Sequence, residues 1–425
     1  MSGKKETIEA KARLSHPVIL AGQPEQVYLR IDVVGAKQEQ SRPPFDISVV
    51  LDRSGSMYGE KIVHARAAVG RLIDGLVGAD HLALTAYDNV AETVFSRRKV
   101  DDALVMRART EQVAPRGSTD ISAGLTAGLQ QLGSKGEALR RVFLLSDGLA
   151  NQGITSPEGL RDLAQQGLAA GRLVSTFGVG WDFNEDLLRK IADAGGGNYY
   201  YIGSPEDIPV ALEQELGELS SVVGQNLTVD FQAQHAQVVA VLGFDGNQLP
   251  AAAGDVQGGG TRSVILALAV PPSEEGEAML GEVRCSWTPL GRALERVEGK
   301  ITVSAVVSAD AVRVQEARDE EVLRAARLQL AAAENREAAR AAAQGDAASF
   351  HRSMVTASAH LAHLGADEDA AEQRDLLEEM QARGFEGTKN DRDMRLRTDE
   401  SQYWMRKSRP SRWSKGDGPR EKKGE

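Results

Sequence analysis

Residues 45–57 read FDISVVLDRSGSM, an apolar segment of strand length that runs directly into a polar loop. The apolar part, residues 47–51, is followed by Asp52, Ser54 and Ser56 at alternate positions. A helical pattern begins a few residues later, so this loop connects a predicted strand to a predicted helix. In open α/β sheets, ligands bind at the loops that follow the carboxyl ends of the strands.

Short apolar segments alternate with amphipathic segments along this part of the chain. The alternation predicts right-handed βαβ connections and a largely parallel sheet with helices on both faces. We therefore expect a Rossmann-like, doubly wound α/β domain over residues 44–222. The predicted strands are residues 47–51, 82–87, 142–145, 174–179 and 198–202. The predicted helices are residues 61–76, 121–132, 157–170, 185–194 and 207–222.

Both flanks of the α/β domain have the pattern of β-structure. Residues 27–33 alternate apolar and polar side chains, and the strands after Gly224 have no helices between them. Two strands alone are marginally stable in water, so we expect residues 1–43 to pair with strands of residues 223–309. The α/β domain would then be an insertion into a β-sandwich. The later strands are predicted at residues 226–232, 237–242, 263–270, 282–287 and 300–307.

The rest of the chain divides into a helical part and a polar tail. Residues 310–384 are rich in Ala, Glu, Arg and Leu, and Gly345 followed by Asp346 ends one helix and caps the next. These signals predict a helical bundle. Residues 385–425 contain a single aliphatic residue of the Leu, Ile and Val type, Leu396, so we expect this tail to be disordered.

The composition of the 425 residues excludes several classes of protein. A net charge of −11 argues against attraction of the whole protein to nucleic acid or anionic membrane. The single cysteine, Cys285, excludes an internal disulfide and a Cys-rich zinc site. The chain has no apolar run long enough to cross a membrane and no apolar segment of a signal peptide near its start. We expect a cytoplasmic protein.

Oxygen-bearing side chains follow further strands of the predicted sheet. Thr119 and Asp120 open the predicted helix at residue 121, and Asp147 follows the strand at residues 142–145. All three loops should leave the same edge of the sheet, where their oxygens can converge on one hard cation. Magnesium prefers such oxygen ligands and commonly keeps several water molecules.

This combination of motifs resembles the von Willebrand factor A domain family, with a complete metal-ion-dependent adhesion site. The resemblance covers about two fifths of the chain, residues 44–222, and the stretch GVGWDFNEDLL is typical of prokaryotic members. The flanking arrangement also resembles, more weakly, the layout of inter-alpha-trypsin-inhibitor-type proteins. The family implies Mg²⁺ (or Mn²⁺ or Ca²⁺) as cofactor, with Asp120 orienting the ligands. By the same resemblance the metal ligands are Asp52, Ser54, Ser56, Thr119 and Asp147.

Three functions are compatible with these sequence features. The first is a non-enzymatic scaffold in which an acidic residue of a partner protein completes the metal's coordination, within a multi-protein assembly. The second is a metal-dependent hydrolase, although no His or Glu in the motif loops offers a general base. The third is a tether to nucleic acid or membrane through the basic tail. We favour the scaffold, because the net charge argues against the tether as the main role.

Weaker signals lie outside these motifs. His360 and His363 have a spacing that suits a metal, but without a third ligand we expect a surface or partly packed pair. We expect Arg53 to be exposed to solvent at the rim of the motif loop. The tail interleaves aromatic and basic residues that could bind a partner or a second copy of the chain. These candidate partner-binding residues are Tyr403, Trp404, Arg406, Lys407 and Trp413.

Overall fold

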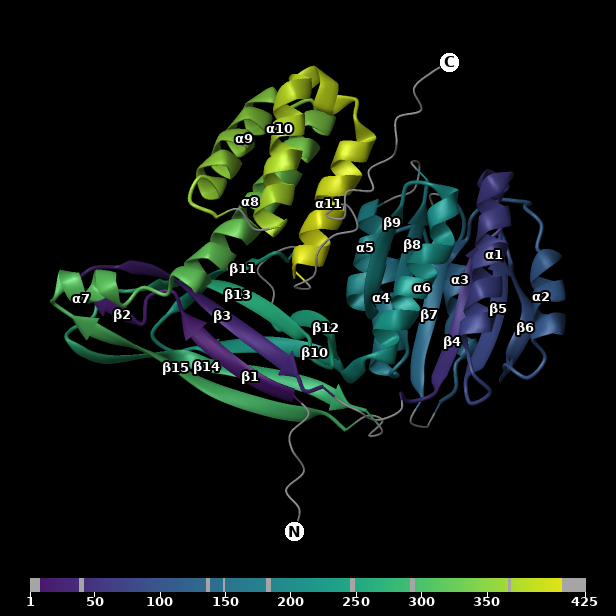
Figure 1. Cartoon of the computed structure of the whole chain (residues 1–425), viewed down its shortest axis with the longest axis horizontal. Coiled ribbons are helices and arrows are strands. Elements are labelled where there is room, and N and C mark those ends of the chain that lie inside the picture. The colour runs from purple at the N-terminus through teal and green to yellow at the C-terminus, as the bar shows by residue number, and fades with distance from the viewer. Residues whose placement is uncertain are drawn as a thin grey trace, which may run out of the picture.

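The structure of the protein is a computed structural model of the 425-residue chain. It contains an α/β domain, two β-sheets that share one core, and a C-terminal group of helices (Figure 1). The structure describes residues 8–37, 42–134, 138–147, 150–180, 185–244, 249–290, 295–365 and 368–406.

The α/β domain is built on a six-stranded sheet in the order β6-β5-β4-β7-β8-β9. The strands are parallel except β6, which runs antiparallel to β5 at one edge. Every residue of β4, β7, β8 and β9 is buried, which is why these strands are nearly continuous apolar runs. The strands are β4 (Phe45–Asp52), β5 (His81–Tyr87), β6 (Ala91–Lys99), β7 (Leu139–Ser146), β8 (Leu173–Val179) and β9 (Gly196–Ile202).

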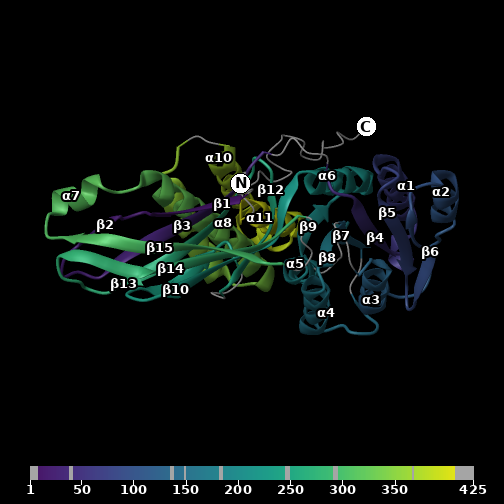
Figure 2. The same cartoon turned by 90° about the horizontal axis from the view of Figure 1, so that it is seen from below.

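Helices cover both faces of this sheet and confirm the predicted α/β fold. Helix α1 contacts α2 and α6 on one face, and α3, α4 and α5 follow one another on the other (Figure 2). Strand β6 and helix α2 were not predicted, because Phe95 is the only fully buried residue of β6 and the alternation there is weak. The helices are α1 (Glu60–Gly75), α2 (Ala103–Glu111), α3 (Ile121–Gln131), α4 (Pro157–Ala169), α5 (Glu185–Ala194) and α6 (Ile208–Ser220).

Two further sheets, called the sandwich below, share one hydrophobic core. The first has the order β1-β3-β13-β11 and the second the order β12-β10-β14-β15-β2. Strand β3 pairs antiparallel with β13, so strands before and after the α/β domain lie side by side, as predicted. The strands are β1 (Ile8–Leu14), β2 (Val18–Leu20), β3 (Glu25–Gly35), β10 (Val222–Ala233), β11 (Gln237–Leu242), β12 (Ala251–Gln257), β13 (Thr261–Val270), β14 (Gly276–Pro289) and β15 (Val297–Ser308).

A buried polar cluster joins the α/β domain to the sandwich. Arg141 of β7 forms an ion pair with Asp255 of β12, and its Nε lies 3.8 Å from a carboxylate oxygen of Glu215 on α6. Glu215 also accepts hydrogen bonds from the hydroxyls of Ser175 at 2.6 Å and Tyr200 at 2.7 Å. Breaking one member of such a cluster leaves a buried charge without its partner, so the cluster fixes how the two parts meet.

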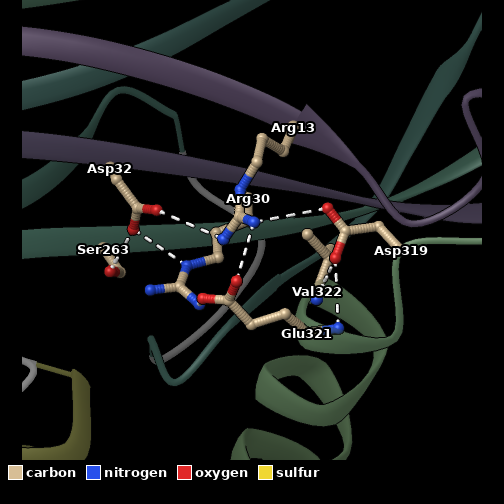
Figure 3. A network of polar contacts seen from close by, with 7 residues as sticks. All are labelled: Arg13, Arg30, Asp32, Ser263, Asp319, Glu321 and Val322. Atoms are coloured by element: carbon tan, nitrogen blue, oxygen red, sulfur yellow. Dashed lines mark hydrogen bonds and ion pairs between the residues drawn. The ribbon is translucent and has the colours of Figure 1, made fainter.

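The C-terminal helices are anchored on the sandwich by ion pairs at the start of α8 (Figure 3). Arg13 of β1 donates to Glu321 at 2.8 Å, and Arg30 of β3 donates to the other oxygen of the same carboxylate at 3.3 Å. Asp319 caps α8 by accepting from the backbone N–H groups of Glu321 and Val322. The helices are α7 (Ala311–Glu316), α8 (Glu320–Gln344), α9 (Ala347–Leu361), α10 (Glu368–Lys389) and α11 (Arg392–Arg406).

The prediction that the chain is disordered from residue 385 is wrong for residues 385–406. Helix α11 packs against β9, and Leu396 is fully buried within the core of the α/β domain. Arg395 pairs with Glu185 of α5 at 2.8 Å, which ties the same helix to the domain. The segment needs no core of its own, because it buries its few apolar residues against another part of the chain. Among the described helices, none combines the length and apolarity needed to cross a membrane.

Candidate metal centre

The motif loops meet at the carboxyl edge of the six-stranded sheet. Asp52 is the last residue of β4, opposite Tyr87 at the end of β5 in the strand register. Ser146 ends the neighbouring strand β7, and Asp147 follows it directly. Parallel strands end on the same side, so side chains far apart in sequence are brought together here.

Asp52 is fully buried and accepts hydrogen bonds from three donors. Its Oδ1 accepts from the backbone N–H of Ser54 at 2.8 Å. Its Oδ2 accepts from the hydroxyls of Ser146 at 2.8 Å and Tyr87 at 3.3 Å. Burial raises the pKa of Asp52 to about 6, the charge of Asp147 acts in the same direction, and the hydrogen bonds oppose the shift. A carboxylate with this environment is stabilised by any cation that binds beside it.

The two serines connect Asp52 to Asp147. The hydroxyl oxygens of Ser54 and Ser56 are 3.0 Å apart, and Ser56 donates to Oδ1 of Asp147 at 2.7 Å. Ser54 and Asp147 are buried, whereas Ser56 is exposed. Two carboxylates and two hydroxyls thus form one polar group that opens to solvent at Ser56.

Lys61 is a member of this group that sequence reasoning missed. It lies in the first turn of α1, and its Nζ is 2.5 Å from Oδ2 of Asp147. The ammonium therefore contacts a carboxylate oxygen that the family resemblance assigns to the metal. A cation that binds Asp147 competes with Lys61 or displaces it.

Thr119 is placed beside the group by its backbone. Its N–H donates to Oδ1 of Asn151 at 2.9 Å, and its carbonyl accepts from the N–H of Asn151 at 3.1 Å. The N–H of Gly55 donates to the carbonyl of Gly117 at 3.2 Å, which ties the Asp52 loop to the Thr119 loop. Within the described part of the chain, Thr119 makes no direct hydrogen bond to the other four predicted ligands.

Asp120 acts as the N-cap of α3. Its Oδ1 accepts from the N–H of Ala123 at 2.9 Å and from the hydroxyl of Ser122 at 2.5 Å. Gly153 packs on this carboxylate so closely that a Cβ at position 153 would lie 2.3 Å from Oδ1. The structure thus shows Asp120 holding the helix start, and its role in orienting metal ligands stays a prediction.

The prediction that Arg53 is exposed is wrong. Only 5% of Arg53 is exposed, and its guanidinium donates to Asp88 at 3.0 Å and to Glu92 at 2.7 Å. Arg116 donates to the same two carboxylates, at 2.7 and 3.1 Å. These two arginines lower the pKa of Glu92, and through Asp88 and Glu92 they link the loop after β4 to the loop after β5. Asp88 follows β5 directly, so the rule that found Asp52 and Asp147 could have identified it.

The donor set fits a hard divalent cation. Carboxylate and hydroxyl oxygens are the ligands that Mg²⁺, Mn²⁺ and Ca²⁺ prefer, and Asp52, Ser54, Ser56 and Asp147 are linked by short contacts. A softer metal would favour histidine or cysteine. In the described residues, no group of three or more His, Cys, Asp or Glu side chains gathers at a metal-binding spacing.

The tail residues and the histidine pair are the remaining candidates from the sequence. Tyr403, Trp404 and Arg406 lie in the last turn of α11, where the structure describes the backbone and not the side chains. Lys407 and Trp413 lie outside the described residues. His363 is exposed and His360 is half-buried, and burial lowers the pKa of His360. The structure therefore places the histidine pair as a surface feature.

Fold and sequence together define the class of the central domain. The chain contains a von Willebrand factor type A domain: residues 46–214 match the model of that family. The chain is similar to a solved structure described as von Willebrand factor type A from Catenulispora acidiphila, with a TM-score of 0.73 and 16% identity. That likeness covers 95% of this chain and 98% of the other, so the fold extends over the sandwich and the helices.

Curated relatives match about half of the chain. The uncharacterized protein sll0103 of Synechocystis sp. (strain ATCC 27184 / PCC 6803 / Kazusa) is 31% identical over 220 residues, 51% of this chain and 51% of the relative. The uncharacterized protein YfbK of Escherichia coli (strain K12) is 25% identical over 233 residues, 53% of this chain and 40% of the relative. The chain thus spans about half the length of these relatives or less.

Proposed function

We propose that this protein is a non-enzymatic scaffold that holds a divalent cation, Mg²⁺ first among the candidates, in its von Willebrand factor type A domain. Asp52, Ser54, Ser56, Thr119 and Asp147 would hold the ion. When bound, the cation supplies a coordination position that an acidic residue of a partner protein can fill. The observation that carries the proposal is the short chain of contacts from Asp52 through both serines to Asp147.

The charges of the two buried carboxylates support the binding of a divalent cation. Asp52 and Asp147 together carry two negative charges in a largely buried place, and Lys61 is the one cationic side chain in direct contact with either in the described structure. A divalent ion balances both carboxylates and keeps Asp52 ionised despite the burial that raises its pKa.

The surface around the centre supports a protein partner. Three large apolar side chains are exposed on the loops that surround the group: Tyr58 at 83%, Val90 at 52% and Ile154 at 44%. Exposed apolar residues beside a polar centre are typical of interaction surfaces. A partner would therefore contact the cation through a carboxylate and the surrounding loops through apolar side chains.

The arrangement favours binding over hydrolysis. In the described structure, the side chains that donate to Asp52 and Asp147 come from Tyr87, Ser146, Ser56 and Lys61, none of which is a general base at neutral pH. Burial and the charge of Asp52 raise the pKa of Tyr87 well above its ordinary value, so Tyr87 stays a neutral donor. The hydrolase is therefore the weaker alternative.

The tail remains a proposed second contact. Helix α11 buries Leu396 in the core of the α/β domain, and the second contact that we propose lies in the residues from Tyr403 onward. Replacing Trp404 and Trp413 with Ala should weaken self-association measured by analytical ultracentrifugation, without changing metal affinity. We keep the cytoplasm as the proposed compartment, which cell fractionation would test.

Two measurements on the full chain test the metal-dependent scaffold. Titration calorimetry should show binding of one Mg²⁺ or Mn²⁺, which Asp147→Asn abolishes while Asp162→Asn, an exposed carboxylate on α4, leaves it unchanged. A pull-down from cell extract should then recover a partner in Mg²⁺ and lose it in EDTA or with Asp147→Asn. Equal metal binding by both variants would refute the site, and a partner retained in EDTA would refute metal-dependent capture.

A further inference from the structure

A pocket lies at the edge of the six-stranded sheet opposite the metal centre, where the α/β domain meets the sandwich. Its volume is about 290 Å³, near the lower end of the range for small-molecule sites. Arg140 at the start of β7 and Gly196 at the start of β9 line one side. Asn226 and Thr228 of β10, with Arg296 just before β15, line the other.

Arg140 is a buried cation that has no acidic partner within ion-pair distance in the described structure. Only 7% of it is exposed, and its Nε donates to the neutral carbonyl of Gly171 at 3.2 Å. Asp46 faces Arg140 in the strand register, but Arg97 binds that carboxylate at 3.0 Å. Burial lowers the pKa of Arg140, the charge of Asp46 opposes this shift, and the charge of Arg172 adds to it. Burial of an unpaired charge is costly, and a bound anion would offset that cost.

Arg296 supplies a second guanidinium to the pocket, and in the described structure its hydrogen-bond partners are neutral groups. Its Nη2 donates to Oγ1 of Thr228 at 2.8 Å and to the carbonyls of Ser286 and Asn226 at 3.0 and 3.3 Å. No acidic side chain belongs to the described lining of the pocket. A pocket lined by two guanidinium groups and by no carboxylate is suited to an oxyanion. The guanidinium groups would bind the oxyanion through charge-assisted hydrogen bonds.

Asn226 adds an unused acceptor at the same place. Its backbone has a positive φ of 57°, which is uncommon for a residue other than glycine, and its N–H donates to Asp255 at 3.3 Å. The side-chain Oδ1 is buried without a hydrogen-bond partner in the described structure. A Cβ at Gly196 would lie 3.1 Å from this oxygen, so glycine leaves room around it. This oxygen has almost no solvent-exposed surface, so a ligand hydroxyl would reach it after the Asn226 side chain turns toward the pocket.

We propose that this pocket binds a small hydroxylated oxyanion, either a carboxylate or a phosphate ester. Arg140 and Arg296 would hold the anionic group, and the hydroxyl would donate to Asn226. The ligand would contact both the α/β domain and the sandwich, close to the ion pair of Arg141 with Asp255. Because it binds the folded state at their junction, it should raise the stability of the whole chain.

Calorimetry and thermal unfolding of the full chain test this proposal. The probes are glycerol 3-phosphate, malate and inorganic phosphate, with sodium chloride at equal ionic strength as reference. We expect millimolar or tighter binding of glycerol 3-phosphate or malate, with a matching rise in unfolding temperature. Tighter binding of glycerol 3-phosphate identifies the ligand as a phosphate ester, and tighter binding of malate identifies it as a carboxylate. Weaker binding of inorganic phosphate than of glycerol 3-phosphate supports the hydroxyl contact with Asn226.

Two variants on the rim locate the binding. Arg296→Gln should weaken it about tenfold, because one charge-assisted pair is lost. Ala169→Glu, at an exposed position of the pocket wall on α4, should weaken it as strongly by supplying a carboxylate to the arginines. Arg71→Gln, an exposed arginine on α1, is the control with the same change in charge. Absence of binding by every probe, or equal affinity in all three variants, would overturn the proposal.

Discussion

The replacement Asp52→Asn should make the metal-free protein more stable. Asp52 is buried, and its pKa is raised from an ordinary value of 3.8 to about 6, first by burial and then by the charge of Asp147. The folded protein therefore binds the proton of Asp52 more tightly than the unfolded chain does. The stability that this proton contributes is complete below pH 3.8 and is lost as the pH rises through about 6.

The size of the effect follows from the two pKa values. One unit of pKa is worth about 1.4 kcal/mol, so above pH 7 the ionised Asp52 costs about 3 kcal/mol. Asparagine has nearly the same shape and carries no charge. Its amide group offers fewer acceptor sites to Ser54, Ser146 and Tyr87 than the carboxylate does, which offsets part of the gain. We expect a net gain of about 1–3 kcal/mol, a rise of roughly 1 to 3 °C in the midpoint of unfolding for a chain of 425 residues that unfolds as one unit.

Thermal unfolding in EDTA at pH 8 and at pH 5 measures this gain. The difference between Asp52→Asn and the parent chain should be largest at pH 8 and shrink at pH 5, where Asp52 is mostly protonated. Excess Mg²⁺ should stabilise the parent chain by about 2.7 kcal/mol at a hundred times its dissociation constant, and leave the variant unchanged. The reasoning fails if the variant is less stable at pH 8 in EDTA, or if the difference does not change with pH. Asp162→Asn, on the exposed face of α4, is the matched control.

Two further predictions concern contacts that only the structure revealed. Lys61→Met should raise Mg²⁺ affinity about fivefold in calorimetry. The reason is that the partly exposed ion pair of Lys61 with Asp147, worth about 1 kcal/mol, no longer competes with the cation. Unchanged or weaker affinity would contradict this competition. Leu396→Ala should lower the free energy of unfolding by about 2–4 kcal/mol in denaturant titration, because Leu396 is fully buried. Val355→Ala, at a position that is 71% exposed, should change it little, and equal effects would show that α11 does not stabilise the domain.

The sequence by itself determined the central domain and most of its candidate metal centre. Buried parallel strands are continuous apolar runs, and their carboxyl ends fall at one edge, so Asp52 and Asp147 could be placed together from strand order alone. The N-terminal strands could be assigned to the later ones because a strand pair without a covering layer is marginal. These features depend on local patterns and on rules of chain connection, which a single sequence displays.

Tertiary structure alone decided which charged groups pair and what the C-terminal segment does. Arg53 looked like a rim residue, yet Asp88 and Glu92 bury it, and Lys61 reaches Asp147 only because α1 starts beside the end of β7. Leu396 is a lone aliphatic residue in a polar segment, and no local pattern marks it as core. Its helix meets partners as distant in sequence as Tyr201, 192 positions from Asp393. Burial of such a residue depends on apolar surface that another domain provides. The hydrophobic periodicity of one segment depends on that segment alone, so it cannot predict this contact.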